Sequence, residues 1–380
     1  MKIAYFTDTY LPQINGVTNT LSKLTKYFSE RDDIEYKIFA PDFKYFESED
    51  TNVERFYSVK FFAYPECRLS LPNLTRLKTA LDEFKPDIIH SVTEINMGLA
   101  GMNYAVQNKI PLISTFTTNF PEYLKFYNLP FLYDMSWSIM RKIHNQSDMC
   151  LCPSLETKKL LESQSINNVG LWGRGIDFEK FKPVEDKSEI KRKYGLEDKI
   201  VLLYVGRVSQ EKNIDILIES YRRLQKEYKE KIALIITGGG PRLEELTKKN
   251  PDVLFTGYLK GKDLTDIYSS ADIFSFPSST ETLGNVVLEA MASGLPVVGP
   301  SAGGLKDNII DGYNGILSVP NEVESFYQGI RALIEDDSKR IEMSKNARAF
   351  AETKSWDRVF EGLIESYKTV LNRNCNLKSA

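Results

Sequence analysis

The chain alternates short apolar runs with longer amphipathic stretches, and this alternation occurs twice along its length. In the first half, strands are expected at residues 2–7, 36–41, 87–92, 111–116, 149–153 and 170–173. Helices are expected between them, including residues 17–30, 74–84 and 132–146. Strands that alternate with helices in this way predict a doubly wound parallel sheet.

The pattern restarts after residues 177–198, a polar, charged stretch with few aliphatic side chains. In the second half, strands are expected at 200–206, 232–237, 253–256, 273–277 and 296–299, and helices at 214–228, 242–249 and 356–371. We therefore predict an α/β chain with two Rossmann-like doubly wound domains, residues 1–180 and 181–355, followed by a helical segment at 356–380. Only the last few residues are expected to be disordered.

Composition narrows the possible functions. A length of 380 residues suits two domains, and 42% apolar with 27% charged residues is typical of a globular protein. A net charge of −3 argues against a globally basic nucleic-acid-binding protein. Neither a secretory signal nor a bilayer-spanning run is predicted. The four cysteines form no Cys-x-x-Cys pair and there are only two histidines, so we expect a cytoplasmic protein without a zinc site.

The usual nucleotide-binding glycine motifs are absent. Neither half carries Gly-x-Gly-x-x-Gly after its first strand, which disfavours a nicotinamide dehydrogenase. The pattern Gly-x4-Gly-Lys-Ser/Thr is also absent, which excludes a P-loop NTPase. No Asp-x-Asp triplet occurs, so the carboxylate pair that often holds a metal-bound diphosphate is missing and metal-independent chemistry is expected.

The most informative segment is residues 276–296, which predicts a strand, a polar loop and a helix beginning near Gly284. The backbone N–H groups of Leu283, Gly284 and Asn285 would lie unpaired at that helix start, which suits a phosphate group. Glu281 in the loop and Glu289 in the helix would accept hydrogen bonds from sugar hydroxyls. The alternative is that Glu281 caps a helix and Glu289 is a solvated surface acid.

Two basic residues follow the first strand of the second half. Arg207 and Lys212 would lie at the carboxyl end of that strand, where they could neutralise a diphosphate without a metal. The alternative is a surface salt bridge from Lys212 to Glu211 or Asp215. Gly16, at the end of the first loop, would let the backbone approach a ligand closely.

The Glu-x7-Glu spacing of Glu281 and Glu289, together with Gly206-Arg207 and Lys212, resembles retaining glycosyltransferase family 4, which has the GT-B fold. The resemblance covers essentially the whole chain. Residues 61–72 and 171–177 are most similar to one subgroup, which contains GDP-mannose-dependent α-mannosyltransferases, diacylglycerol α-glucosyltransferases and sulfoquinovosyl diacylglycerol synthases. The family resemblance implies two domains that face each other across a cleft. The acceptor would bind to the first domain and the nucleotide sugar to the second. The C-terminal helix would cross back to the first domain.

The resemblance also implies residue roles. Glu281 would bind hydroxyls of the donor sugar, and Glu289 would bind the ribose. Arg207 and Lys212 would hold the diphosphate. Further donor contacts are implied at Gly16, Tyr258, Leu259, Leu283, Gly284 and Asn285, and acceptor contacts are expected at Asn119, Tyr123 and Arg174. The co-substrate would be a UDP- or GDP-linked sugar, with UDP-hexose slightly preferred, and no other cofactor is expected.

One position departs from the family pattern. Residues 114–119 read Ser-Thr-Phe-Thr-Thr-Asn, and Thr117 occupies the position where the family commonly has a histidine thought to support the reaction centre. A threonine hydroxyl can donate a hydrogen bond but cannot act as a base near neutral pH. The family mechanism, a front-face displacement, depends more on positioning and charge stabilisation than on a base, so Thr117 is retained as a catalytic candidate.

Aromatic and basic residues at 60–64 and 123–142 indicate either a patch that docks a membrane lipid acceptor or ordinary core aromatics with solvated charges. The resemblance favours reversible association with the inner face of the membrane. The leading prediction is a retaining hexosyltransferase with a glycolipid product. The alternatives are a sugar-nucleotide epimerase of the same fold and a non-catalytic sugar-nucleotide-binding subunit.

Overall fold

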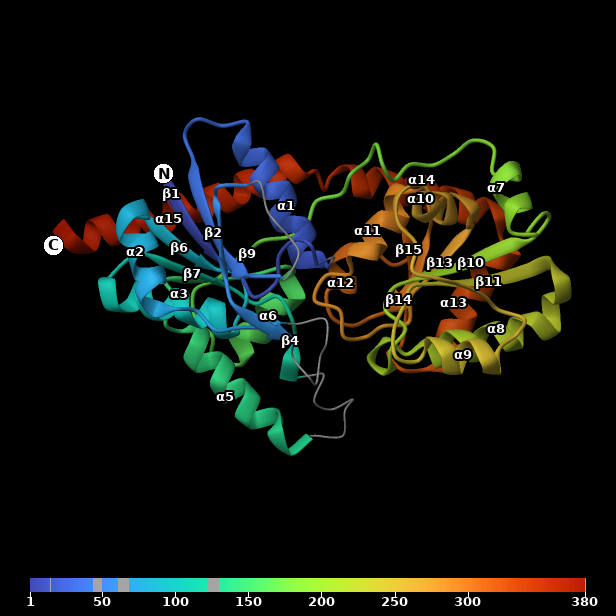
Figure 1. The fold of residues 1–380 in the computed structure, drawn as a ribbon. Helices are drawn as coiled ribbons and strands as arrows, with labels where there is room; N and C mark the ends of the chain where they lie inside the picture. The colour runs from blue at the N-terminus through green and yellow to red at the C-terminus, as the bar shows by residue number, and fades with distance from the viewer. Residues whose placement is uncertain (14, 44–49, 61–67, 122–129, 380) are drawn as a thin grey trace. The chain divides into compact units, whose positions relative to one another are not determined.

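The computed structural model describes residues 1–13, 15–43, 50–60, 68–121 and 130–379. The chain forms two compact units (Figure 1). The first contains residues 1–121, 130–174 and 356–380, and the second contains Gly175–Ser355. We expected a boundary after residue 180; in the structure Arg174 ends the first unit and Gly175 begins the second.

The described residues of the first unit form a parallel sheet with strand order β3-β2-β1-β6-β7-β8-β9. Its strands are β1 (Lys2–Phe6), β2 (Glu35–Pro41), β3 (Val53–Phe56), β6 (Ile88–Ser91), β7 (Leu112–Thr115), β8 (Met149–Cys152) and β9 (Val169–Leu171). Its helices include α1 (Gly16–Ser29), α2 (Leu74–Phe84), α3 (Asn96–Asn108), α5 (Tyr133–His144), α6 (Leu155–Ser163) and α15 (Trp356–Ser379). A short antiparallel pair, β4 (Ser58–Lys60) and β5 (Arg68–Ser70), is separate from this sheet.

The C-terminal helix α15 is part of the core of the first unit. Five of its side chains are buried in the same apolar cluster as residues of β1 and α1: Phe360, Leu363, Ile364, Tyr367 and Val370. Burial of an apolar side chain of this size contributes about 2 kcal/mol, so this helix adds substantially to the stability of the unit. Figure 1 shows α15 beside α1.

A buried chain of hydrogen bonds joins α15 to the sheet. The Tyr367 hydroxyl lies 2.7 Å from the Tyr5 hydroxyl and 2.7 Å from Nδ1 of His90. Nε2 of His90 lies 2.6 Å from the Thr115 hydroxyl, at the end of β7. Burial and the charge of Arg174 lower the pKa of His90 to about 3, so the ring is neutral and both of its nitrogens have structural partners.

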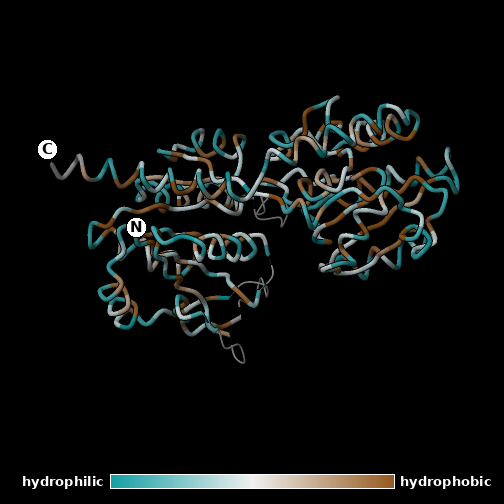
Figure 2. The backbone as a smooth tube through the Cα atoms, turned by 90° about the horizontal axis from the view of Figure 1, so that it is seen from above, coloured by the Kyte–Doolittle hydropathy of each residue, from teal (hydrophilic) through white to brown (hydrophobic). Residues whose placement is uncertain are grey.

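The second unit repeats the architecture, with strand order β12-β11-β10-β13-β14-β15. Its strands are β10 (Ile200–Val205), β11 (Ile232–Thr237), β12 (Leu254–Gly257), β13 (Ile273–Ser275), β14 (Val297–Pro300) and β15 (Gly315–Ser318). The helices are α7 (Ser188–Lys193), α8 (Ile214–Tyr228), α9 (Leu243–Lys249), α10 (Gly261–Ser270), α11 (Asn285–Ala292), α12 (Leu305–Asn308), α13 (Val323–Glu335) and α14 (Asp337–Glu352). Figure 2 shows hydropathy alternating along many of the helices, as expected for elements with one buried face.

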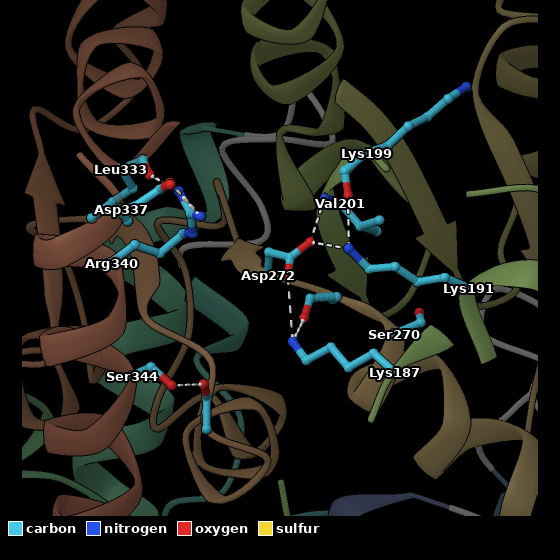
Figure 3. A network of polar contacts seen from close by, with 12 residues as sticks. Lys187, Lys191, Lys199, Val201, Ser270, Asp272, Leu333, Asp337, Arg340 and Ser344 are labelled. Atoms are coloured by element: carbon cyan, nitrogen blue, oxygen red, sulfur yellow. Dashed lines mark hydrogen bonds and ion pairs between the residues drawn. The ribbon is translucent and has the colours of Figure 1, made fainter. Parts of the chain in front are cut away.

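Asp272 ties α7 to the amino-terminal edge of this sheet (Figure 3). Its carboxylate accepts hydrogen bonds from the backbone N–H of Val201, 2.9 Å away, and from Nζ of Lys191, 2.8 Å away. Nζ of Lys187 lies 3.3 Å from the other carboxylate oxygen. Although burial opposes the charge, the two lysines and the Val201 N–H lower the pKa of Asp272. Ligands bind to such sheets at the carboxyl ends of the strands. The Asp272 network lies at the opposite edge.

Most expected strands and helices are present, but several observed elements were not predicted. The strands β3, β4, β5 and β15 were not predicted, because they are short and carry no long apolar run. Four helices were not predicted either: α7, α12, α13 and α14. The C-terminal helix was expected to end at residue 371 with disordered residues after it, whereas α15 continues to Ser379. None of the helices in the described part of the chain is both long and apolar enough to cross a membrane.

Candidate active site

Lys212 and Glu281 form an ion pair in the second unit. Lys212 follows β10 and Glu281 follows β13, and these two parallel strands are neighbours in the sheet. The loops after neighbouring parallel strands leave the sheet at the same edge, which explains why these residues meet although they are distant in sequence. Their side chains are 12% and 17% exposed, so the pair is sheltered but open to a ligand.

The two loops are held together by further contacts around the pair. Nδ2 of Asn213 lies 3.4 Å from the Ser279 hydroxyl, and the Thr280 hydroxyl donates to the backbone carbonyl of Glu211 at 3.4 Å. Asn213 has a φ of +52°, a left-handed conformation that asparagine tolerates, and α8 begins directly after it. This sharp turn keeps Lys212 next to the loop after β13. Asp215, one of the alternative partners considered for Lys212, pairs with Arg242.

Glu281 is fixed by its own loop and by two glycines. The Ser278 hydroxyl donates to Oε1 of Glu281 at 2.9 Å, and the backbone N–H of Gly304 donates to the Glu281 carbonyl at 2.8 Å. A Cβ atom at Gly303 would lie 2.4 Å from that carbonyl oxygen, which is too close for any other residue. Gly303 and Gly304 therefore allow the close approach that holds the Glu281 loop in place.

Arg207 follows β10 after Gly206 and is half-buried. Its backbone carbonyl accepts a hydrogen bond from the buried Tyr204 hydroxyl at 2.8 Å. The Tyr204 ring stacks on Phe276, with centroids 5.5 Å apart, which connects β10 to the end of β13. Burial, together with the carboxylates of Glu281 and Glu211, raises the pKa of Tyr204 well above its usual value, so this hydroxyl stays a donor.

Helix α11 begins shortly after Glu281, the acidic member of the Lys212–Glu281 pair. Gly284 caps the helix in a left-handed conformation, with φ +78°, and no side chain caps the helix start. Among the described residues, the backbone N–H groups of Leu283 and Gly284 donate no hydrogen bond. These donors, with Asn285 as the first helical residue, lie where the sequence analysis expected a phosphate group, and anion binding there stays a prediction.

Glu289 lies within α11 and is held by a buried tyrosine. The Tyr268 hydroxyl donates to Oε2 of Glu289 at 2.9 Å, and within the described part of the chain this is the one hydrogen bond of the Glu289 side chain. Burial raises the pKa of Glu289 to about 7, although the Tyr268 hydrogen bond and Lys180 oppose the shift. The carboxylate thus keeps one oxygen, Oε1, available for a ligand. It is not a fully solvated surface acid.

Tyr258 and Leu259 follow β12 at the edge of the sheet. Tyr258 is 61% exposed, whereas Leu259 packs partly against the core of the second unit. β12 is separated from β10 by β11, so these residues lie farther along the same sheet edge than Lys212 and Glu281.

The other expected site residues belong to the first unit. Gly16 opens α1 and is exposed, directly after Asn15, whose side chain caps the helix by accepting from the N–H of Thr18 at 2.9 Å. Thr117 follows β7 and is half-buried, and Asn119 is buried. Arg174 follows β9 and is 9% exposed. Tyr123 lies outside the described residues.

Several residues that shape the site were not singled out from the sequence. Tyr204, Tyr268 and Ser278 contact Arg207, Glu289 and Glu281 respectively, and nothing in their local sequence marks them. The Gly303-Gly304 pair was the available signal, because consecutive glycines often mark a close backbone approach. His90 and His144 are fully buried and belong to the core of the first unit.

Among the described residues, no group of three or more His, Cys, Asp or Glu side chains could hold a metal ion. Metal-independent chemistry remains a prediction.

Comparison with known proteins identifies the family. A model for Glycosyltransferase Family 4 matches residues 14–180, and a model for glycosyl transferases group 1 matches residues 186–350. A GDP-mannose-dependent α-mannosyltransferase of Corynebacterium glutamicum is 30% identical over 382 residues, covering 98% of this chain and 89% of the relative. The chain belongs to glycosyltransferase family 4.

Other relatives of this family 4 glycosyltransferase match the predicted subgroup. An α-monoglucosyldiacylglycerol synthase of Streptococcus pneumoniae is 30% identical, covering 78% of this chain and 70% of the relative. A sulfoquinovosyl transferase of Arabidopsis thaliana is 35% identical over 77% of this chain and 58% of the relative. The chain is therefore a hexosyltransferase that transfers a sugar from a nucleotide sugar.

Solved structures confirm the predicted GT-B fold. HepE of Anabaena in complex with UDP has a TM-score of 0.77 at 19% identity, covering 97% of this chain and 100% of that chain. Sucrose-phosphate synthase of Thermosynechococcus elongatus has a TM-score of 0.78 at 17% identity, covering 98% and 99%. At these identities the likeness shows the fold alone.

Proposed function

We propose that this glycosyltransferase moves a hexose from a UDP- or GDP-linked donor to a hydroxyl group of a membrane glycolipid acceptor such as diacylglycerol, with retention at the anomeric carbon and without a metal ion. The Lys212–Glu281 pair carries the proposal, because it places a cation and a hydrogen-bond acceptor side by side at the carboxyl edge of the sheet. A nucleotide sugar offers the matching groups, a diphosphate joined directly to a ring of hydroxyls.

In this proposal the diphosphate accepts hydrogen bonds from Lys212, Arg207 and the N–H groups at the start of α11. The sugar hydroxyls donate hydrogen bonds to Glu281. Charge-assisted hydrogen bonds from these cations would stabilise the negative charge that develops as the diphosphate leaves. The N–H groups of Leu283 and Gly284, which donate no hydrogen bond among the described residues, would contribute to the same charge.

Retention fits a front-face displacement. The acceptor hydroxyl oxygen forms a bond to the anomeric carbon while the bond from that carbon to the diphosphate oxygen breaks on the same face. The hydroxyl proton passes to the departing phosphate oxygen, so the products are a glycoside and a nucleoside diphosphate. Thr117 takes the position of the family histidine, where its hydroxyl can hydrogen-bond the donor sugar but cannot act as a base.

Glu289 is proposed to accept a hydrogen bond from the ribose of the nucleotide. Tyr268 occupies Oε2 and leaves Oε1 for the ligand. Tyr258 and Leu259 lie farther along the same edge and are proposed to line the base pocket.

The acceptor proposal rests on the relatives and on α5. One relative is named as a monoglucosyldiacylglycerol synthase and another as a sulfoquinovosyl transferase. A relative that matches nearly the whole chain is named as a GDP-mannose-dependent mannosyltransferase. On α5 and the turn before it, Phe131, Met135 and Ile139 are 74%, 53% and 47% exposed, and Lys142 is exposed on the same helical stripe. An exposed apolar stripe beside a lysine suits reversible contact with an anionic membrane surface.

Other aromatics of the predicted patch belong to the core. Trp137 is 2% exposed and stacks on Phe116 with centroids 6.1 Å apart, and Tyr133 packs edge-on against Trp137. Residues 61–64 and 123–129, also part of that patch, lie outside the described residues.

Ligand binding measured without metal is the first test. Melting temperatures with UDP, GDP, UDP-glucose and GDP-mannose in EDTA should rise for one base and not for the other, because a ligand that binds the folded state stabilises it. The donor so identified is then supplied with radiolabelled sugar and vesicles that contain diacylglycerol. Transfer of label to lipid supports the proposal. Binding without transfer to any acceptor favours the non-catalytic subunit suggested by Thr117, and release of an epimerised sugar nucleotide favours the epimerase.

A further inference from the structure

Arg174 is a buried cation that has no acidic partner among the described residues. It is 9% exposed, and its Nη1 donates to the carbonyl oxygens of Gly173 and Trp172 at 3.2 and 3.4 Å. Its guanidinium lies over the Trp172 ring, 5.0 Å from the centroid. Within the described residues, no aspartate or glutamate forms an ion pair with it. In contrast, partly buried arginines elsewhere pair with carboxylates: Arg31, Arg242, Arg340 and Arg348.

The surroundings of Arg174 do not compensate its charge. Burial lowers the pKa of Arg174 to about 10, and no acid in the described part of the chain raises it. The nearby imidazole of His90 is neutral and has structural partners at both nitrogens, so it cannot neutralise the charge. An uncompensated buried charge costs several kcal/mol, and the three interactions above offset only part of that cost. The fold therefore carries a cation that it does not use for its own stability.

Two nitrogens of the Arg174 guanidinium remain for a ligand. Nε and Nη2 donate no hydrogen bond among the described residues. Arg174 follows β9, so these donors lie at the carboxyl edge of the parallel sheet of the first unit, the edge at which such sheets bind ligands. The Nε and Nη2 pair of a guanidinium forms a fork that matches two oxygens of an oxyanion.

We propose that Arg174 forms an oxyanion-binding subsite of the first unit that takes a phosphate-type group. Arg174 belongs to the first unit, whereas the proposed diphosphate contacts at Lys212 and Arg207 belong to the second. The oxyanion has two possible sources, a charged group of the acceptor or the diphosphate of the donor. This deepens the proposed function and rests on it only for the identity of the ligand, because oxyanion binding itself needs no turnover.

Inorganic phosphate tests the subsite by calorimetry and thermal shift on the full chain. The decisive comparison is Lys212→Gln against Lys212→Gln/Arg174→Gln, since both variants lack the main cation of the second unit. Loss of a charged hydrogen-bonding partner is expected to weaken phosphate binding about tenfold or more. Without phosphate, Arg174→Gln should melt higher than the wild type, because an uncompensated buried charge has been removed. Equal phosphate affinity in the two variants, or no phosphate binding to Lys212→Gln, overturns the proposal.

Two further arms identify the source of the oxyanion. If the donor supplies it, Arg174→Gln weakens UDP or GDP binding; if the acceptor supplies it, nucleotide binding is unchanged and binding to vesicles with phosphatidylglycerol falls relative to phosphatidylcholine. No change in either overturns the proposal. Should the variants that carry Arg174→Gln fail to fold, hydrogen exchange on Lys212→Gln alone replaces them: phosphate should protect the amides of residues 170–176, and no protection counts against the subsite. A protein that binds phosphate here but transfers no sugar contradicts the proposed function alone.

Discussion

The Lys212 ammonium and the Glu281 carboxylate neutralise each other across the loops that follow two adjacent strands, β10 and β13. Each side chain is therefore held in place before any ligand arrives. A bound nucleotide sugar would replace the contact between the two side chains with two contacts of its own. Its diphosphate would bind the lysine, and its sugar hydroxyls would donate to the glutamate. Such a preorganised pair loses little conformational freedom on binding, which is the condition for strong electrostatic stabilisation.

Substitution of either partner should nearly abolish transfer. Lys212→Ala and Glu281→Ala are each expected to lower kcat/KM by 100-fold or more, about 2.7 kcal/mol, because each leaves a sheltered opposite charge and a ligand group without a partner. Steady-state kinetics with the identified donor checks this. Lys248→Ala is the matched control, since it breaks the exposed Lys248–Glu244 pair of the same unit and should leave kcat/KM unchanged. Normal turnover in both site variants would remove this pair from the active site.

Nucleotide binding should weaken as the pH falls through about 7. Burial raises the pKa of Glu289 from its ordinary 4.5 to about 7, so below that pH the carboxyl carries a proton and loses its strength as an acceptor. Tyr268 donates to the charged form, so Tyr268→Phe should raise this pKa further and move the binding midpoint to higher pH. Calorimetric titrations of the nucleotide between pH 5.5 and 8.5, which cover both sides of that pKa, measure the dissociation constant at each pH. An identical midpoint in the wild type and the phenylalanine variant would contradict the role of Tyr268.

The raised pKa of Glu289 also predicts that the stability of the fold depends on pH. Stability falls as the pH rises, whereas nucleotide binding strengthens. Because the folded state holds the Glu289 proton that the unfolded chain releases above pH 4.5, this group makes folding less favourable as pH rises from 4.5 to about 7. Glu289→Gln should therefore raise the melting temperature at pH 8 but not at pH 4, while it weakens nucleotide binding. A gain at pH 4 equal to that at pH 8 would mean that the carboxyl is not perturbed as described.

The sequence could predict each of these side chains but not how they meet. Helix α8 and strand β11 were predicted at their observed bounds, because strong apolar periodicity marks both. The Lys212–Glu281 contact depends on β10 lying beside β13, and strand order is a tertiary property that local pattern does not encode. Tyr268 supports Glu289 from a different helix, and β3 and β15 pair at sheet edges where burial leaves a weak apolar signal. Local periodicity thus predicted the elements and the residue types, whereas the contacts between loops required the fold.

Tyr367→Phe should destabilise the first unit. The Tyr367 hydroxyl bridges Tyr5 and His90 in a fully buried position, and its removal leaves both without this partner at a cost of about 1–3 kcal/mol. Urea unfolding measures the loss. Tyr57→Phe serves as the control, because its side chain is 63% exposed and its removal should change stability little. Equal stability of the two variants would mean that the buried chain contributes nothing net.

Thr117→His restores the residue common in the family at this position. If the threonine only replaces the histidine in bonding the donor sugar, the variant should transfer as fast as the wild type or faster, since an imidazole offers the same hydrogen bond. Initial rates at saturating donor, measured for the wild type, Thr117→His and Thr117→Val, distinguish the cases. A collapse in the histidine variant would show that the half-buried position of Thr117 accommodates only the smaller side chain.

The exposed stripe of α5 predicts membrane binding that depends on apolar side chains. Ile139→Glu places a charge in the middle of the stripe, between Met135 and Lys142, and should reduce co-sedimentation with anionic vesicles by about tenfold, because it removes buried apolar area and adds repulsion. Val106→Glu is the matched control: Val106 is 50% exposed on α3 of the same unit and lies outside the stripe. Both variants should keep full activity toward a water-soluble acceptor analogue if one is accepted. Equal loss of sedimentation in the two variants would mean that added negative charge, and not the α5 stripe, controls the interaction, and undiminished sedimentation of Ile139→Glu would place membrane contact elsewhere.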